Sequence, residues 1–85
     1  MAVRTAESGV MRVVRDPQIQ FGEPTVRGSR TTVSSIVLAA CGGDGVAGIL
    51  KGYPHLNAAD VADALAFYVQ NRAEIDQIIA RSVVD

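Results

Sequence analysis

Glycine and proline divide this chain into short segments, and this spacing limits most elements to a few residues. Proline lacks a backbone donor and restricts the residue before it, and glycine weakens a helix. The breaks fall at Asp16-Pro17, Gly22-Glu23-Pro24, Gly28-Ser29, Gly42-Gly43 and Gly52 to Pro54. Only the segment after these breaks is long enough for an extended helix. The spacing therefore predicts a small domain of short elements.

The N-terminal part of the chain favours short strands. The β-branched run VMRVV, residues 10–14, predicts a strand. QIQF, residues 18–21, is a second strand candidate, and the chain extends again at Thr25-Val26 after a turn. Residues 1–9 carry no such pattern and are expected to be disordered.

The middle of the chain predicts two short helices. Residues 33–40 follow Thr32, a good N-cap, and Gly42-Gly43 ends them. Residues 45–53 predict the next helix, with Asp44 as its cap. The apolar faces are Val33, Ile36, Val37 and Ala40 in the first helix, and Val46, Ile49 and Leu50 in the second.

The C-terminal segment carries the clearest helix signals. Asn57 is a good N-cap, and Leu56 and Val61 have the spacing of a hydrophobic staple. The apolar positions Val61, Leu65 and Tyr68 are interrupted at Arg72 and resume at Ile75 and Ile79. This pattern predicts one helix of roughly 25 residues, or two helices with a break near Asn71.

Length and composition indicate one small aliphatic domain. The chain has 85 residues, of which 48% are hydrophobic and only 5% aromatic. A domain of this size has marginal stability, which oligomerisation commonly improves. No apolar run reaches the roughly 18 residues of a membrane span, and the N-terminus has no signal-peptide core, so we expect a cytoplasmic protein.

Charge is unevenly distributed around a net value of −1. Residues 1–42 hold five arginines against three acidic residues, 5 − 3 = +2, and residues 43–85 hold three basic against six acidic residues, 3 − 6 = −3. Because nucleic-acid binders usually carry a clear basic surplus, we expect only modest nucleic-acid affinity for each copy.

Catalytic and metal-binding patterns are weak in this sequence. His55 is the only histidine and Cys41 the only cysteine, so a metal site or a nucleophile–base pair has few candidates. The CGGDG stretch at residues 41–45 lacks the lysine of a phosphate-binding loop. We expect no enzymatic activity, no metal and no cofactor.

An ordered set of motifs from Val14 to Tyr68 resembles the domain-of-unknown-function 433 family. The matching residues are Asp16-Pro17, Gly22 and Pro24, Gly28-Ser29-Arg30, Tyr53-Pro54-His55-Leu56, and Asp60 with Ala64-Leu65 and Tyr68. The resemblance implies a mostly α fold: a small helix-turn-helix, homeodomain-like domain of three to four helices, preceded by short N-terminal β-strands. We assign it to residues 10–85, including a C-terminal helical extension.

The same resemblance implies the antitoxin half of a type II toxin–antitoxin system, similar to VapB-type antitoxins. Such proteins form homodimers, bind their own operator DNA and block a PIN-like ribonuclease toxin. Two alternatives stay open: a stand-alone DNA-binding regulator, and a protein–protein adaptor that does not bind DNA.

The densest basic chemistry lies in the turn around Gly28-Ser29. Arg27 and Arg30 are candidates for phosphate or groove contact by an arm ahead of the helices. The alternative for Arg30 is a structural role, either pairing with a carboxylate or capping a helix end. The full set of candidate DNA-binding residues is Arg27, Arg30, Ser34, Ser35, Lys51, His55 and Asn57.

The predicted third helix is a poor base reader. Its first residues include Asp60 and Asp63, which repel phosphate, and they include no arginine, lysine or glutamine. This composition is typical of a solvated acidic face, and it fits the adaptor alternative.

The C-terminal residues form a candidate partner-binding stripe. It comprises Arg72, Ile75, Ile78, Ile79 and Arg81. An amphipathic helix of this kind can dock into the groove of a toxin. The alternative is that the isoleucines pack against their own domain or within a homodimer.

Overall fold

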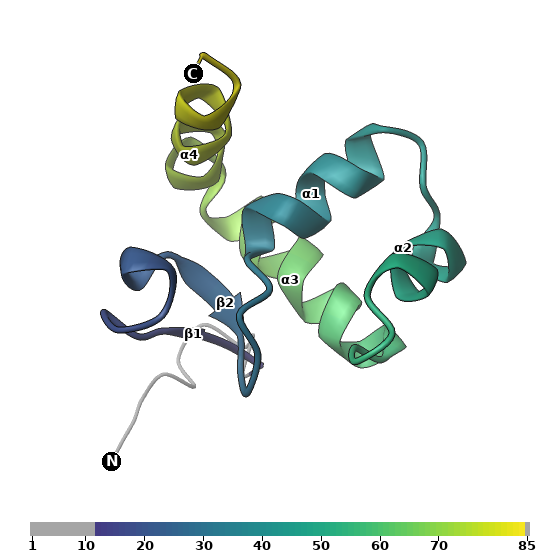
Figure 1. Cartoon of the computed structure of the whole chain (residues 1–85). Coiled ribbons are helices and arrows are strands. Elements are labelled where there is room, and N and C mark those ends of the chain that lie inside the picture. Colours follow the sequence, from purple (N-terminus) through teal and green to yellow (C-terminus); the bar gives the residue numbers. More distant parts are fainter. Residues whose placement is uncertain (1–11, 85) are drawn as a thin grey trace.

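The computed structural model describes residues 12–84. A short hairpin precedes four helices (Figure 1). The elements are β1 (Val13–Arg15), the 3-10 helix η2 (Gln20–Gly22), β2 (Pro24–Val26), α1 (Val33–Cys41), α2 (Val46–Gly52), α3 (Ala58–Gln70) and α4 (Arg72–Val84). This arrangement confirms the predicted mostly α domain with short N-terminal strands. The prediction for residues 1–9 lies outside the described residues.

The hairpin is antiparallel and joins directly onto the first helix. β1 pairs with β2 in the register Val13 to Val26 and Arg15 to Pro24. An isolated bridge from Thr25 to Thr32 then attaches β2 to the start of α1. The strand predicted over residues 10–14 is observed at residues 13–15, and residues 10 and 11 are outside the described part.

The second predicted strand, residues 18–21, is wrong. Gln20, Phe21 and Gly22 have φ values of 51°, 57° and 84°, all in the left-handed region. Turn hydrogen bonds close this loop, from Ile19 N to Asp16 O at 2.8 Å and from Glu23 N to Gln20 O at 3.0 Å. The breaks at Pro17 and Gly22 therefore leave room for a tight turn and none for a strand.

The helix caps agree with the sequence at two of three positions. The Ser35 backbone N–H donates to Thr32 Oγ1 at 3.1 Å, and Asn57 forms a reciprocal capping box with Asp60. The predicted cap Asp44 is wrong, because Gly45 occupies the N-cap position of α2 without a side-chain bond. The backbone N–H of Asp44 instead donates to Ala39 O, at the end of α1.

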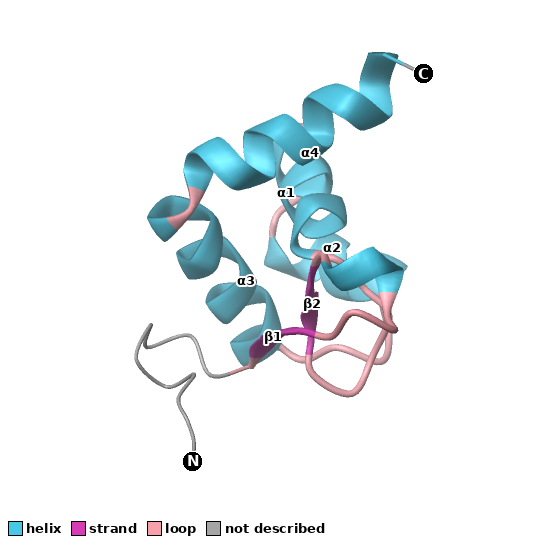
Figure 2. Cartoon of the chain, turned by 90° about the vertical axis from the view of Figure 1, so that its left-hand side faces the viewer, coloured by secondary structure: helices cyan, strands magenta, loops and turns pink. Residues whose placement is uncertain are grey.

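The C-terminal segment forms two helices, as one of the two predictions stated. The break is Asn71, whose Nδ2 donates to the carbonyl of Phe67 at 3.0 Å. Helix α4 then turns back across α1 (Figure 2).

The core is an aliphatic cluster with α1 at its centre. It gathers the inner faces of α1, α3 and α4, with one residue from each hairpin strand, one from α2 and one from the α2–α3 connection. Its members are Val13, Val26, Val33, Ile36, Val37, Ile49, Leu56, Val61, Ala64, Phe67, Ile75 and Ile78. The inward stripe of α3 is Val61, Ala64 and Phe67, so the predicted Leu65 and Tyr68 lie half-buried beside it.

Substitution of Ile75 by Ala tests whether α4 belongs to the core. Ile75 has 0% exposure, so we expect a loss of about 2–5 kcal/mol in the free energy of unfolding, measured by urea denaturation. The matched control is Gln77→Ala on the exposed side of α4, which should change stability by less than about 0.5 kcal/mol. Equal effects of the two variants would show that α4 is not packed.

Candidate nucleic-acid interface

The basic turn between β2 and α1 is held in one conformation by its own hydrogen bonds. Ser29 Oγ donates to the Val26 carbonyl at 2.9 Å and accepts from the Thr31 backbone N–H at 3.1 Å. Gly28 has φ 79°, a value that side-chain-bearing residues rarely adopt. The sequence Gly28-Ser29 therefore builds the turn, and Arg27 and Arg30 on either side of it are both exposed.

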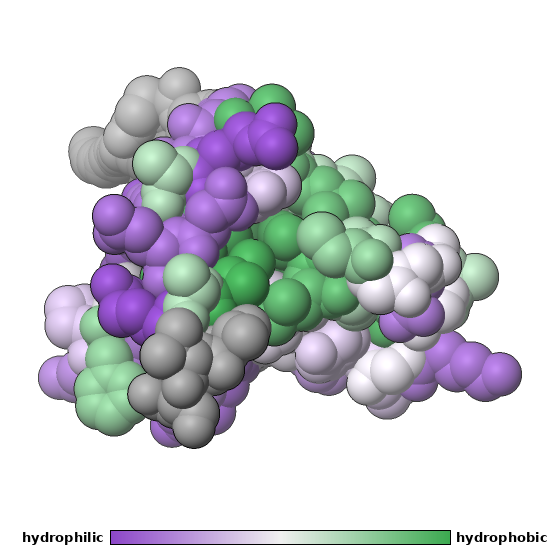
Figure 3. Space-filling view, turned by 90° about the horizontal axis from the view of Figure 1, so that it is seen from above, coloured by the Kyte–Doolittle hydropathy of each residue, from purple (hydrophilic) through white to green (hydrophobic). Residues whose placement is uncertain are grey.

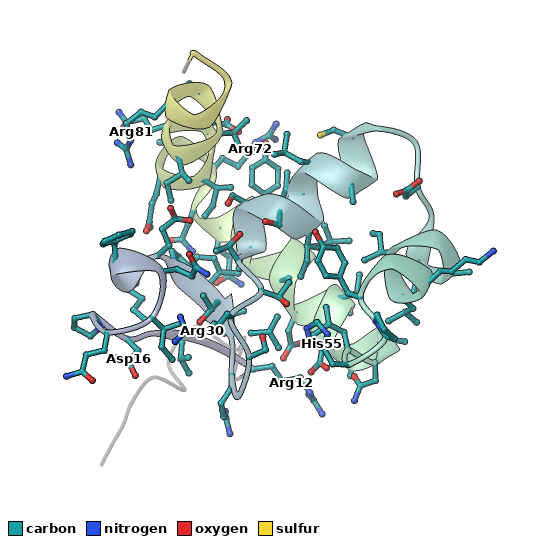
Figure 4. All side chains as sticks on the ribbon, viewed as in Figure 1. Arg12, Asp16, Arg30, His55, Arg72 and Arg81 are labelled. Carbon is teal, nitrogen blue, oxygen red and sulfur yellow. The ribbon has the colours of Figure 1, made fainter. Side chains whose placement is uncertain are left out.

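Arg30 is presented to solvent at the hairpin side of the molecule (Figure 4). Within residues 12–84, the ion pairs are made by Arg12 and Arg15, and Arg30 has no carboxylate partner there. The expected structural pairing of Arg30 with a carboxylate is thus absent from the described residues. Its guanidinium is available to an anionic partner.

A single hydrogen bond joins the basic turn to the α2–α3 turn. Thr31 Oγ1 lies 2.7 Å from His55 Nε2. The Tyr53 and His55 rings meet edge to face, with centroids 6.2 Å apart. His55 therefore acts as a latch between two turns that are far apart in sequence.

Arg12 pairs with both aspartates at the start of α3 and offsets part of their charge. Its Nε lies 3.3 Å from Asp60, its guanidinium lies 3.6 Å from Asp63, and its backbone N–H donates to Asp63 at 3.2 Å. Asp60 also accepts the Asn57 backbone N–H at 2.9 Å. The sequence did not reveal this pairing, because Arg12 precedes these aspartates by about fifty positions and no local spacing links them. The two aspartates are occupied rather than forming an unpaired acidic face.

The remaining candidate DNA-binding residues divide into engaged and exposed groups. The hydroxyls of Ser34 and Ser35 lie 3.1 and 2.7 Å from Thr32 Oγ1, so both take part in the start of α1. The Asn57 side chain caps α3. Lys51 is exposed near the end of α2. Arg27, Arg30 and Lys51 are the exposed basic side chains among these candidates, and His55 is engaged by Thr31.

The early solvent face of α3 carries no base-reading side chain. Its exposed residues there are Ala58, Ala59 and Ala62, none of which has a side-chain hydrogen-bond donor or acceptor. Near the end of α3, Val69 and Gln70 are exposed, and Gln70 is the one of these residues with a polar side chain.

The candidate partner stripe on α4 is mostly internal. Ile75 and Ile78 lie in the core and Ile79 is half-buried, which agrees with the self-packing alternative for these residues. Arg72 lies over the Tyr68 ring at 5.4 Å, and Arg81 is exposed. Both arginines lie at the opposite end of the molecule from Arg12 and His55 (Figure 4).

Two polar contacts fasten α4 to the rest of the domain. Arg15 of β1 forms a two-pronged ion pair with Glu74, one prong at 2.9 Å, and its guanidinium lies 5.2 Å from the Phe67 ring centroid. The Glu74 carboxylate accepts these hydrogen bonds and raises the pKa of Arg15, with partial opposition from burial. The Tyr68 hydroxyl donates to Asp76 at 2.8 Å, and this bond raises the pKa of Tyr68.

Phe21 is the most exposed large apolar side chain of the described residues, at 99%. The sequence analysis missed it, because a strand over residues 18–21 would have placed it in a sheet. The signal that was available is Gly22 directly after it, which marks a turn with left-handed backbone.

Within residues 12–84, no group of three or more His, Cys, Asp or Glu side chains is placed to hold a metal ion. The helices of the same residues are all too short or too polar to cross a membrane.

Comparisons with known proteins agree on one family. The family model described as "Protein of unknown function (DUF433)" matches residues 13–68, which include both latched turns. A crystal structure of a DUF433 member protein from Anabaena variabilis shares 30% sequence identity with a TM-score of 0.77, covering 81% of this chain and 68% of that chain. A search of curated proteins finds no match.

Removal of the latch hydroxyl should cost stability. Thr31→Val deletes the bond to His55, and we expect a loss of about 1 kcal/mol in urea unfolding. The matched control is Thr25→Val, since Thr25 is fully buried and its Oγ1 has no hydrogen-bond partner. That variant should be neutral or stabilising. Equal losses in both variants would contradict the latch.

Proposed function

This chain belongs to the DUF433 family, and from that premise we propose that it is a non-enzymatic, dimeric antitoxin-like protein of the cytoplasm. It binds operator DNA through the basic turn and a PIN-like ribonuclease toxin through a separate apolar surface. The observation that carries the proposal is the pair of exposed arginines, Arg27 and Arg30, on a turn held rigid by its own bonds and by the His55 latch.

Rigid presentation is what makes this turn suitable for phosphate contact. A guanidinium that is already positioned loses less conformational freedom on binding than one on a flexible tail. Arg12 offsets part of the charge of the two neighbouring aspartates, so they oppose an approaching phosphate less than the sequence indicated. With an alanine-rich α3, DNA affinity depends on backbone contacts and gains sequence preference only from the arm.

A protein partner is supported by the apolar surface away from this turn. Phe21 stands on a loop whose strained backbone fixes it outward, and such strain is tolerated most often at functional positions. Seen from above, apolar side chains also cover the middle of the molecule (Figure 3). The apolar residues of α1 and α4 include Leu38, which is 44% exposed, and Ile79, which is half-buried.

The second candidate function is a protein–protein adaptor without DNA binding. The apolar solvent face of α3 favours it, because a helix lined with alanine suits close packing against another protein better than contact with a groove of DNA.

DNA binding is tested by fluorescence anisotropy on the protein's own upstream DNA over a range of salt concentrations. For Arg27→Ala combined with Arg30→Ala, we expect weaker binding and a salt slope reduced by about 1 for each lost phosphate contact. Arg81→Ala, at the opposite end of the molecule, is the control and should bind as the original protein does. Unchanged binding by the double variant would refute the arm and favour the adaptor.

The apolar anchor is tested separately with the product of the neighbouring gene. We expect Phe21→Ala to weaken binding of that protein by roughly 30-fold or more, because a buried aromatic anchor at an interface contributes about 2 kcal/mol or more. Val46→Ala is the control, since it removes an exposed apolar side chain from α2, outside the surface named above. An equal or smaller effect of Phe21→Ala would remove Phe21 from the interface. Deletion of residues 75–85 is unsuitable, since it removes core residues.

A further inference from the structure

The two last helices are separated by one residue. Helices α3 and α4 have 13 residues each, and only Asn71, at φ −137° and ψ 43°, lies between them. The flanking residues, including Gln70, Arg72 and Ala73, are good helix formers. A short connection between two elements that each prefer to continue is the condition under which proteins exchange an element between copies.

Some contacts near Asn71 require the bend between α3 and α4, and others would also form in a straight helix. In a straight helix, Tyr68 and Asp76 would be about 12 Å apart along the axis, so their hydrogen bond exists only in the bent form. The Phe67 carbonyl now accepts from the Asn71 side chain, and in a straight helix the Asn71 backbone N–H would replace it. Straightening therefore loses one exposed bond and keeps the backbone satisfied.

The core packing of α4 and its ion pair with Arg15 can both be made with a second copy. Ile75 and Ile78 pack into the core around α1, and Glu74 pairs with Arg15 of β1. Neither contact depends on which chain supplies α4. The same burial and the same ion pair form when α4 comes from the other molecule.

A seam of apolar residues becomes continuous only when the helix is straight. Ala62, Ala66, Val69 and Ala73 follow at steps of four, three and four, which is the spacing of a helix-pairing face. In the bent form the seam is interrupted at Asn71, and Val69 is 68% exposed. Two straight helices that cross near Asn71 would cover this residue. Asp76, the next position at this spacing, ends the seam.

We propose that the homodimer exchanges its C-terminal helix: α3 and α4 join into one helix, and α4 of each copy packs on α1 of the other. The partner is a second copy of this chain. The inference rests on the homodimer named in the proposed function, and it adds the mode of assembly.

The first test changes the connection and measures mass by light scattering during gel filtration. The original protein should have the mass of two copies, and Asn71→Ala should keep that mass down to lower concentration. Insertion of two glycines after Asn71 lets α4 fold back without strain, and should give a monomer with unchanged helical circular dichroism. An inserted variant that stays dimeric at every concentration where the original protein is dimeric would overturn the exchange.

The second test reports which chain supplies α4. Arg15→Glu and Glu74→Arg each place like charges together, within one chain or across an exchanged homodimer. When the two variants are unfolded together and refolded, only an exchanged heterodimer restores opposite charges at both sites. We expect native mass spectrometry to show more heterodimer than random pairing gives, with a higher melting temperature than either variant alone. Random pairing would overturn the proposal.

These experiments need neither DNA nor toxin, so they fail independently of the proposed function. A dimer with random pairing refutes the exchange and leaves the dimeric antitoxin-like protein intact. A monomer at all concentrations refutes both the exchange and the dimer, while the DNA and partner measurements still stand on their own.

Discussion

Helix α1 presents Val33 and Ile36 with no exposed surface, and it contacts β2, α2, α3 and α4. Burying its inner face requires all four of these elements, because α1 alone is too short to be stable in water. The hairpin supplies Val26 and attaches at Thr32, α3 supplies Val61 and Ala64, and α4 covers the remaining side with Ile75 and Ile78. Every other feature, including the basic turn ahead of α1, takes its position from this packing.

The four arginines between residues 12 and 42 divide into two pairs with different tasks. Arg12 and Arg15 lie on or beside β1 and pair with carboxylates of α3 and α4, so they attach the hairpin to the helices. Arg27 and Arg30 flank a glycine-built turn and are exposed. Part of the acidic surplus of the second half therefore lies in ion pairs that hold the hairpin against the helices. The opposite charges of the two halves therefore have two effects. They attach the hairpin to the helices, and they set the charge of the exposed surface.

Signals confined to a few neighbouring residues predicted much of this fold. Caps such as Thr32 and Asn57, and the break at Asn71, depend on local hydrogen bonds, and the structure has them where the sequence placed them. The loop at residues 18–21 and the Asp44 cap failed, because β propensity and cap preference were outweighed by turn closure and by the end of α1. The inward face of α3 differs from the predicted stripe, because Ala64 and Phe67 are buried with Val61, whereas Leu65 and Tyr68 are only half-buried.

The candidate site was also predicted only in part from the sequence. The exposed arginines of the turn follow from Gly28-Ser29 and were predictable, whereas two determinants of the surface depend on partners distant in sequence. These are the Arg12 pairing with α3 and the Thr31 bond to His55. The exposure of Phe21 follows instead from the local turn at Gly22. Single-sequence patterns report spacing within one element and carry no information about which elements meet.

The length of α3 places the basic turn far from the bend at Asn71, where we propose that two copies assemble. Its N-terminus lies beside the turn latched by His55, and its C-terminus is the bend at Asn71, about 20 Å away along a helix of 13 residues. The proposed exchange at the bend would therefore leave both basic turns uncovered. A single copy has a net charge of −1, which disfavours strong attraction to DNA. In the proposed homodimer, two copies joined at their far ends would present two arginine turns to one duplex, and the second contact would then form at a high effective concentration.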